Sequence, residues 1–189
     1  FINWATSKEY LALVAENEST LIFVNSRMLC EKLAHKMNQD EPAPVAYAHH
    51  GSLSKELRLA VEQRLKNGDL KAIVATNSLE MGIDVGALDC VVMVQCPGKI
   101  SSAVQKVGRA GHQVGAVSKA VVFPSYSRDF LESAVLAEAV QERAIEAVRP
   151  VEAPLDVLAQ VLVSILGTGP WDIDELFALV RSAYPYRTL

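Results

Sequence analysis

Two short segments of the chain contain the residue types that phosphate chemistry needs. Residues 105–112 read Gln-Lys-Val-Gly-Arg-Ala-Gly-His, and residues 75–86 read Ala-Thr-Asn-Ser-Leu-Glu-Met-Gly-Ile-Asp-Val-Gly. Each follows an apolar run typical of a strand, so both are expected at the carboxyl ends of strands, where open α/β sheets bind ligands. Arg109 stands between two glycines, which leave room for a phosphate beside its permanently charged guanidinium. The alternative is that Ser102 and Gln105 form a capping box and Arg109 makes a surface ion pair.

The segment 75–86 offers groups that suit nucleic acid and nucleotide. Thr76 and Asn77 end a buried strand, where a hydroxyl and exposed amides could hold a nucleic-acid phosphate. Gly82 allows a tight turn, and Asp84 is a carboxylate able to accept hydrogen bonds from ribose hydroxyls, or else a helix or turn cap. Two such segments about one β-α unit apart are far more specific than either alone.

The elements that must position these segments alternate along the chain. Five runs rich in Val, Ile and Ala lack clean alternation, which is typical of parallel strands covered on both faces. These runs are residues 20–26, 45–50, 71–76, 90–95 and 119–124. Helices are expected at residues 8–15, 28–38, 54–67 and 101–107. Strand and helix alternate, so the pattern predicts an α/β fold with a doubly wound parallel sheet and flanking helices.

The stretch 54–67 has the period of an amphipathic helix. We expect its periodic apolar residues to face the core and its charged residues to be solvated. The apolar set is Leu57, Ala60, Val61 and Leu65. Asn67 and Gly68 end the stretch, and glycine there suits a left-handed cap.

After residue 124 the pattern changes from strands to helices. Residues 126–148 read as one long helix, and residues 149–154 contain two prolines that stop a helix and stiffen a connection. We therefore place a domain boundary here, which divides the chain into residues 1–149 and 150–189.

The last part of the chain predicts two further helices. Residues 155–166 are strongly apolar, and residues 172–184 are amphipathic, with Asp172 and Glu175 at capping-box spacing. Two helices without a third partner cannot bury their apolar faces alone. We therefore expect these helices to be the start of a larger, truncated module.

Composition excludes several classes of protein. The chain has 189 residues, half of them hydrophobic, which is enough for one well-packed domain and part of a second. Its net charge of -4 argues for nucleic-acid contact built from a few local donors only. No apolar run reaches the ~20 residues of a membrane span and no secretory signal is present, so we expect a soluble, cytoplasmic protein without a membrane partner.

Neither the cysteines nor the acidic residues form a recognisable metal site. The cysteines are odd in number and lack C-x-x-C spacing, which favours reduced, mostly buried thiols. They are Cys30, Cys90 and Cys96. Residues 174–175, Asp-Glu, superficially look like a metal-holding acidic motif but lie in the tail helix. We therefore expect no metal to be bound by this part of the protein itself.

The chain also lacks a G-x-x-x-x-G-K-[ST] phosphate loop. Residues 98–99 are Gly-Lys, yet Ile100 follows them and Met93 stands where the first glycine should be. The magnesium site and most of an ATP-binding surface are therefore expected outside these residues.

Taken together, the chain resembles the second RecA-like lobe of superfamily 2 helicases, and in particular the large helicase-related (Lhr) family. Residues 20–27 resemble motif IV of the family, residues 49–54 with Arg58 motif IVa, residues 75–86 motif V, and residues 105–112 motif VI. The tail resembles the start of the winged-helix domain that follows this lobe in the family, at residues 154–160 and 171–181. The resemblance implies a RecA-like parallel sheet followed by a short helical remnant of a winged-helix domain.

The resemblance implies roles on the ATP side of the lobe. Arg109 matches the arginine finger that stabilises charge at the γ-phosphate, an effect of about 10³-fold or more in related NTPases. Gln105 would sit beside it as a second catalytic residue that senses the nucleotide. Gly82 and Asp84 would contact the ATP ribose or assist lobe closure. His112 replaces the commoner arginine, as is usual for the Lhr branch, and is expected to have a structural or modest sensing role in the ATP site.

The resemblance also implies a grip on one nucleic-acid strand. Residues matching the family's strand-binding positions would hold its sugar-phosphate backbone without reading sequence. They are Ser26, Arg27, Gly51, Ser52, Arg58, Thr76 and Asn77. The implied partners are single-stranded DNA, a DNA:DNA or RNA:DNA duplex, and the first RecA-like lobe of the same chain, with DNA repair as the setting.

The chain is thus interpreted as one lobe of an ATP-dependent helicase, with ATP and Mg²⁺ as cofactors and Mg²⁺ held mainly by the missing first lobe. Alone it is expected to be inactive as an ATPase. Two alternatives stay open: a non-catalytic RecA-like lobe that binds nucleic acid or a partner, and a different α/β nucleotide-binding protein complete in itself.

Overall fold

The computed structural model describes residues 4–79, 88–110 and 118–189 of the chain. The chain folds into two compact units, Phe1–Glu146 and Ala147–Leu189, and each unit is described here by itself.

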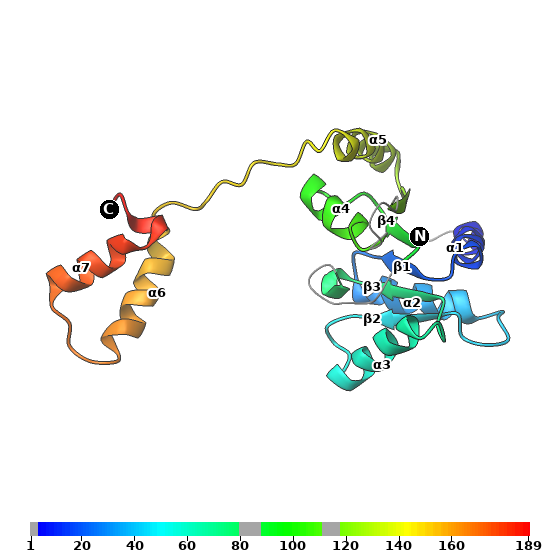
Figure 1. The fold of residues 1–189 in the computed structure, drawn as a ribbon, viewed down its shortest axis with the longest axis horizontal. Helices are drawn as coiled ribbons and strands as arrows, with labels where there is room; N and C mark the ends of the chain where they lie inside the picture. The colour runs from blue at the N-terminus through cyan, green and yellow to red at the C-terminus, as the bar shows by residue number, and fades with distance from the viewer. Residues whose placement is uncertain (1–3, 80–87, 111–117) are drawn as a thin grey trace. The chain divides into compact units, whose positions relative to one another are not determined.

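The first unit is built on a parallel sheet (Figure 1). Within the described residues the sheet has five strands in the order β2-β3-β1-β4-β5, and every neighbouring pair is parallel. The strands are β1 Thr20–Phe23, β2 Ala46–His49, β3 Ala72–Ala75, β4 Cys90–Val94 and β5 Lys119–Phe123. All five predicted strands are confirmed, and the last residues of each predicted run lie in the loops at the carboxyl edge of the sheet.

Helices cover both faces of this sheet, as the absence of clean alternation predicted. They are α1 Trp4–Glu16, α2 Arg27–Asn38, α3 Lys55–Lys66, α4 Ile100–Val107 and α5 Ser127–Gln141, with a short 3₁₀ helix η1 Asn77–Leu79. On β1, Ile22 packs with α1 and α2, whereas Leu21 and Phe23 pack with α3. The result is the predicted α/β fold with a parallel sheet and flanking helices, with one apolar cluster on each face of the sheet.

Local sequence signals account for the ends of α3. The Ser54 hydroxyl accepts a hydrogen bond from the backbone N–H of Leu57 (3.3 Å) and begins the helix. Gly68 follows the end of the helix with φ of 77°, which is the predicted left-handed cap. The predicted apolar face is only partly correct: Val61 is buried, but Leu57 is 56% exposed, because the helix turns Glu62 toward the sheet instead.

The structure differs from the sequence analysis in the length of α5 and in the alternative of a capping box at α4. Helix α5 ends at Gln141 rather than near residue 148, because Arg143 adopts a left-handed backbone (φ 56°) and the following residues are not helical. Helix α4 begins at Ile100, so Ser102 lies inside the helix and is not the N-terminal residue of a capping box with Gln105.

The second unit contains two helices and a short 3₁₀ helix. These are α6 Leu155–Leu166, α7 Ile173–Ser182 and η2 Tyr184–Tyr186. The Asp172 carboxylate caps α7 by accepting hydrogen bonds from the backbone N–H groups of Asp174 and Glu175 (2.9 and 3.2 Å). No residue of α6 is buried in the described chain. None of the helices in the described residues is long and apolar enough to cross a membrane.

Candidate functional site

The carboxyl ends of β1, β2 and β3 lead into three loops that enclose one cavity of about 480 Å³, here called the β-edge cavity. Five of the residues predicted to bind nucleic acid line it. These are Ser26, Arg27, Gly51, Thr76 and Asn77. They come from three segments far apart in sequence, and they meet because parallel strands present their carboxyl ends at one edge of the sheet.

The lining of the β-edge cavity is suited to an anion. The first residues of α2 border it, and the first N–H groups of a helix lack partners within the helix and attract negative charge. Ser26 caps α2, its hydroxyl oxygen accepting the backbone N–H of Leu29 (3.2 Å), so its own proton stays available to a ligand. Arg27 is exposed beside it and adds a permanent positive charge.

A buried histidine fixes the loop that carries Gly51. His49 is fully buried, with Nε2 2.8 Å from Glu62 Oε1 on α3 and Nδ1 2.9 Å from Ser78 Oγ. Burial lowers the pKa of His49 and outweighs the hydrogen bond to Glu62, which raises it, so we assign a neutral imidazole. In that state Nε2–H donates to Glu62, and Nδ1 is an acceptor beside the Ser78 hydroxyl, which also donates to the backbone carbonyl of His49 (3.1 Å). This arrangement fastens the end of β2 to the segment after β3.

A second histidine pair holds the next residue of the same loop. His50 Nε2 lies 2.7 Å from Glu31 Oε1 on α2, and the backbone N–H of Ser52 donates to His50 Nδ1 (3.3 Å). The loop is therefore tied to α2 on one side and to α3 on the other. Neither pair was identified from the sequence, although the consecutive histidines after a strand were a signal that could have been followed.

The two remaining residues of the predicted strand-binding set lie differently. Ser52 and Arg58 are both described in the structure, but neither lines the β-edge cavity. The N–H of Ser52 is directed to His50, which leaves its hydroxyl as the group that can reach a ligand. Arg58, on α3, is partly buried, and its positive charge contributes to the lowered pKa of His49. Its Nε is buried and forms no hydrogen bond within the described residues.

The predicted catalytic residues lie on and after α4. Gln105 is exposed on the last turn of the helix, and Arg109 follows Gly108, with its backbone N–H bonded to the carbonyl of Lys106 (3.0 Å). A Cβ added at Gly108 would lie 3.1 Å from the carbonyl oxygen of Val104, so glycine allows the tight turn that presents Arg109. The other predicted ATP-binding residues, Gly82, Asp84 and His112, lie outside the described residues.

A distant carboxylate fixes the beginning of α4. The residue before this helix, Lys99, provides no side-chain cap. Instead, Glu146 accepts hydrogen bonds from the backbone N–H groups of Ile100 (2.5 Å) and Ser101 (2.9 Å). The bonds from Ser101 and Ile100 lower the pKa of Glu146 to about 2. The helix that presents Arg109 is thus anchored by a residue 46 positions away from its start.

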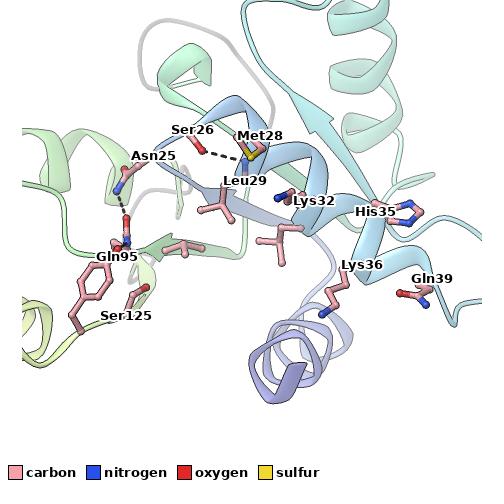
Figure 2. Close-up of a pocket in the computed structure, with 13 residues that line it drawn as sticks. Asn25, Ser26, Met28, Leu29, Lys32, His35, Lys36, Gln39, Gln95 and Ser125 are labelled. Atoms are coloured by element: carbon pink, nitrogen blue, oxygen red, sulfur yellow. Dashed lines mark hydrogen bonds between the residues drawn. The ribbon is translucent and has the colours of Figure 1, made fainter. Parts of the chain in front are cut away.

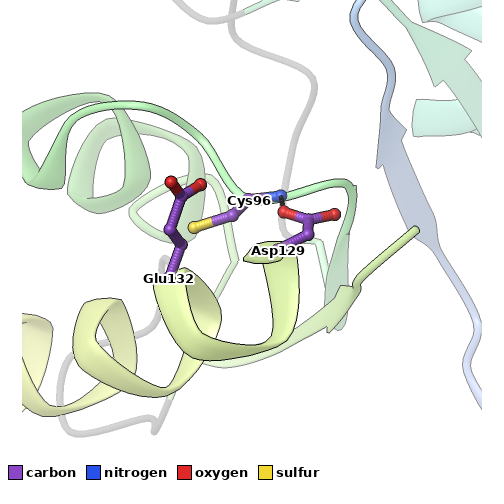
Figure 3. Close-up of side chains that lie close together, drawn as sticks. All are labelled: Cys96, Asp129 and Glu132. Carbon is purple, nitrogen blue, oxygen red and sulfur yellow. Dashed lines mark hydrogen bonds between the residues drawn. The ribbon is translucent and has the colours of Figure 1, made fainter. Parts of the chain in front are cut away.

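Three potential metal ligands also gather at the start of α5 (Figure 3). Cys96, Asp129 and Glu132 place their ligand atoms within 4.8 Å of one another. However, both carboxylate oxygens of Asp129 accept backbone N–H groups, from Cys96 and Ser125 (2.7 Å each). Burial raises the pKa of the Cys96 thiol, which keeps it protonated. This geometry favours a structural role, in which Asp129 joins the loop after β4 to α5.

The other cysteines are free thiols in the core. Cys30 and Cys90 are buried, and burial raises the pKa of Cys30 to about 11. All three cysteines are therefore unlinked, as the sequence predicted.

Two protein families match the chain in succession. Residues 4–113 match the family described as helicase conserved C-terminal domain. Residues 138–189 match the winged helix domain of the large helicase-related protein.

The proteins whose sequences are similar to this chain are named as helicases. The chain is 40% identical to the ATP-dependent helicase Lhr-Core protein 2 of Thermococcus barophilus, over 94% of this chain and 21% of that protein. It is 39% identical to the Lhr helicase/uracil glycosylase of Escherichia coli, over 93% of this chain and 14% of that protein. The chain thus spans about a fifth or less of the length of these relatives.

A solved structure has the same fold at higher identity. The helicase Lhr of Mycobacterium smegmatis, bound to ssDNA and AMP-PNP, superposes with a TM-score of 0.91 and 44% sequence identity. The match covers 97% of this chain and 25% of that protein. A DEAD box protein from Methanococcus jannaschii matches with a TM-score of 0.60 and 26% identity, over 74% of this chain and 38% of that chain.

Proposed function

The chain belongs to the helicase C-terminal domain family, in its large helicase-related branch, and from this premise we propose that it is the second RecA-like lobe of an ATP-dependent nucleic-acid helicase. In this proposal residues 1–149 form the lobe, and residues 150–189 begin a winged-helix domain. The observation that carries it is the β-edge cavity, where the ends of three strands bring together five of the seven predicted strand-binding residues.

The β-edge cavity grips the backbone of a single strand. Arg27, the hydroxyls of Ser26 and Thr76, and the helix N-terminus are all groups that bind phosphate or sugar oxygens. Contacts of this kind hold a strand regardless of its sequence, which a translocating enzyme requires. The relative from M. smegmatis is bound to ssDNA, which supports DNA as the strand that this chain binds. The duplexes unwound would be DNA:DNA or RNA:DNA.

Arg109 acts on the nucleotide from the opposite side of a cleft between two lobes. Its guanidinium would reach the γ-phosphate of an ATP held mainly by the phosphate loop and Mg²⁺ of the first lobe, and would stabilise the charge that develops there. Gln105 on the preceding turn lies close enough in sequence to sense the same phosphate. Gly82, Asp84 and His112 would complete this half of the ATP site. The relative bound to AMP-PNP supports ATP as the nucleotide.

The residues for strand binding and for ATP hydrolysis are attached to the same sheet. β1 and β4 are adjacent, and the loop after β1 lines the β-edge cavity, whereas β4 leads into α4 and Arg109. Closure of the two lobes on ATP would therefore shift the strand-binding loops as one body. Alternate tightening and release of the strand gives stepwise movement along it.

The proposal is tested by comparing the isolated chain with the same chain joined to the segment that precedes it in the full-length protein. We expect the isolated chain to bind single-stranded DNA weakly and to show no ATPase activity, and the longer protein to hydrolyse ATP faster when single-stranded DNA is added. The measurement is ATP turnover with and without oligo(dT). A longer protein that binds DNA but never hydrolyses ATP would instead be the non-catalytic nucleic-acid-binding lobe.

A further inference from the structure

A second and larger cavity adjoins the β-edge cavity along α2 (Figure 2). It has a volume of about 770 Å³ and lies between α2, the end of β4 and the loop that leads into α5. We call it the α2 cavity. Asn25 and Ser26 line both cavities, so the two lie side by side at the end of β1.

The α2 cavity is basic although the chain is acidic overall. Figure 2 shows Lys32, His35 and Lys36 projecting from α2, and all three line the cavity. Among the described residues that line it, none is acidic, whereas the whole chain has a net charge of -4. Glu31, on the same helix, does not line the α2 cavity and is paired with His50. The α2 cavity therefore concentrates positive charge where an anion could enter.

An exposed aromatic ring stands at the opposite wall of the α2 cavity. Tyr126 is 63% exposed, yet its hydroxyl is held by a hydrogen bond from Gln95 Nε2 (2.6 Å). Gln95 Oε1 in turn accepts from Asn25 Nδ2 (2.8 Å), the dashed contact in Figure 2. Two hydrogen bonds through Gln95 thus link Asn25, two residues after β1, to the hydroxyl of Tyr126.

The backbone at Gln95 is unusual. Its φ is 73°, a left-handed conformation that residues with a side chain adopt at a cost in free energy. Its N–H donates to the carbonyl of Phe123 (2.9 Å), which holds the strained turn against β5. This conformation places the Gln95 amide between Asn25 and Tyr126, where it holds the hydroxyl of the exposed ring. An exposed aromatic surface in a cavity lined by basic side chains suits base stacking by single-stranded nucleic acid.

We propose that the α2 cavity binds the nucleotides adjoining those held in the β-edge cavity, with one base stacked on Tyr126 and the phosphates facing Lys32 and Lys36. This inference rests on the proposed strand-binding function and extends the path of the strand along α2. Because every base has a π-face, the added contact is also independent of sequence.

The test measures the affinity of the full-length protein for oligo(dT) by fluorescence anisotropy. Tyr126→Ala is expected to weaken binding of a long oligonucleotide by about 5- to 100-fold, the range of one base-stacking contact. Phe130→Ala is the matched control, because Phe130, on α5 four residues after Tyr126, is also 63% exposed but does not line the α2 cavity. Tyr126→Phe keeps the ring and loses only the hydrogen bond from Gln95, so it should weaken binding less than Tyr126→Ala does.

Oligonucleotide length and a parallel variant separate this inference from the proposed function. With an oligonucleotide too short to fill both cavities, Tyr126→Ala should bind as wild type does. If Arg27→Ala weakens binding while Tyr126→Ala behaves like Phe130→Ala, the α2 cavity does not bind the strand and the inference is wrong. If Arg27→Ala, Arg58→Ala and Tyr126→Ala all bind like wild type, the strand-binding function itself fails.

A measurement on the unmodified protein avoids any dependence on folding of the variants. An oligonucleotide carrying 5-iodouracil cross-links to aromatic side chains on which the base stacks. We expect peptide mapping to find the adduct on Tyr126. Adducts found only on other residues would overturn the inference.

Discussion

The β-edge cavity and the end of α4 are both predicted to touch phosphate, but they are built in different ways. Three loops of this chain enclose the β-edge cavity, and the pairs His49–Glu62 and His50–Glu31 hold its central loop from both sides. Arg109, in contrast, stands at the end of a single short helix that is anchored at its other end by Glu146.

This difference suggests how the two functions are divided. A grip on a strand can be assembled within one lobe, because its groups need only a fixed relative position. An arginine finger acts only when a second lobe supplies the nucleotide. We therefore expect strand binding to be a property of this chain and ATP hydrolysis to be a property of two lobes together.

The largest effect is expected from Arg109. Arg109→Ala in the longer protein should lower DNA-stimulated kcat by about 10³-fold or more, because charge at the γ-phosphate is no longer stabilised. Affinity for single-stranded DNA should change less than about twofold, since Arg109 is outside the β-edge cavity. Arg128→Ala is the control, because Arg128 is an exposed arginine paired with Glu132. A comparable loss in Arg128→Ala would show that the effect is not specific to position 109.

Replacement of the buried His49 should weaken both nucleic-acid binding at the β-edge cavity and the stability of the fold. His49→Ala breaks contacts to Glu62 and Ser78 and should lower the free energy of unfolding by about 2–4 kcal/mol. Because burial lowers the pKa of His49, the unfolded state takes up a proton below pH 6.5 that the folded state does not. Wild type should therefore lose stability as the pH falls below 6.5, and His49→Ala should lose this component.

Denaturant unfolding at several pH values measures this effect. His35→Ala serves as the control, because His35 is exposed on α2. A pH dependence that is unchanged in His49→Ala would contradict the assignment of a neutral, buried imidazole.

The loss of a single contact with the nucleic-acid strand should have a smaller effect. Arg27→Ala should weaken oligo(dT) binding by about 5- to 10-fold and reduce the salt dependence by about one phosphate contact. Saturating kcat should not change. Lys71→Ala is a matched control, because Lys71 is exposed and precedes β3, at the amino edge of the sheet. Equal weakening by both variants would indicate general charge attraction rather than a built site.

The smallest effect is expected at Glu146, which is an exposed helix cap. Glu146→Gln should lower Tm by less than about 3 °C at neutral pH. The pKa of Glu146 is lowered from 4.5 to about 2, so its contribution is present above pH 4.5 and is lost as the pH falls toward 2. Thermal unfolding across this range should show a shallower acid dependence in the variant. An acid dependence equal to that of wild type would mean that Glu146 does not cap α4 in solution.

The sequence predicted the parts of the fold that depend on local pattern. Apolar runs without alternation identified all five strands. Because the strands are parallel, the residues that directly follow β1, β2 and β3 lie at one edge of the sheet. Ser26, Gly51 and Thr76 were grouped as strand-binding residues by the resemblance to the helicase family, and the sheet topology explains why they meet in the structure.

Long-range polar contacts were beyond such reasoning. The charge pattern of α3 placed Glu62 on a solvated face, but its pairing with His49 turns it inward. The residues after Gln141 favour helix, so the sequence predicted a longer α5. In the structure these residues are not helical, and Glu146 contacts the start of α4 instead. Gln95 gave no local signal, because its role depends on Asn25 and Tyr126 from two other segments.

The most direct test of this division is the ATPase rate of the longer protein as a function of single-stranded DNA concentration, for Arg109→Ala and Arg27→Ala in parallel. The account predicts that Arg109→Ala removes the maximal rate without weakening DNA binding, as measured by anisotropy. It predicts that Arg27→Ala raises the half-maximal DNA concentration and leaves the maximal rate unchanged. If both variants instead change only the maximal rate, or only the half-maximal DNA concentration, strand binding and the arginine finger are not separate functions and the account is wrong.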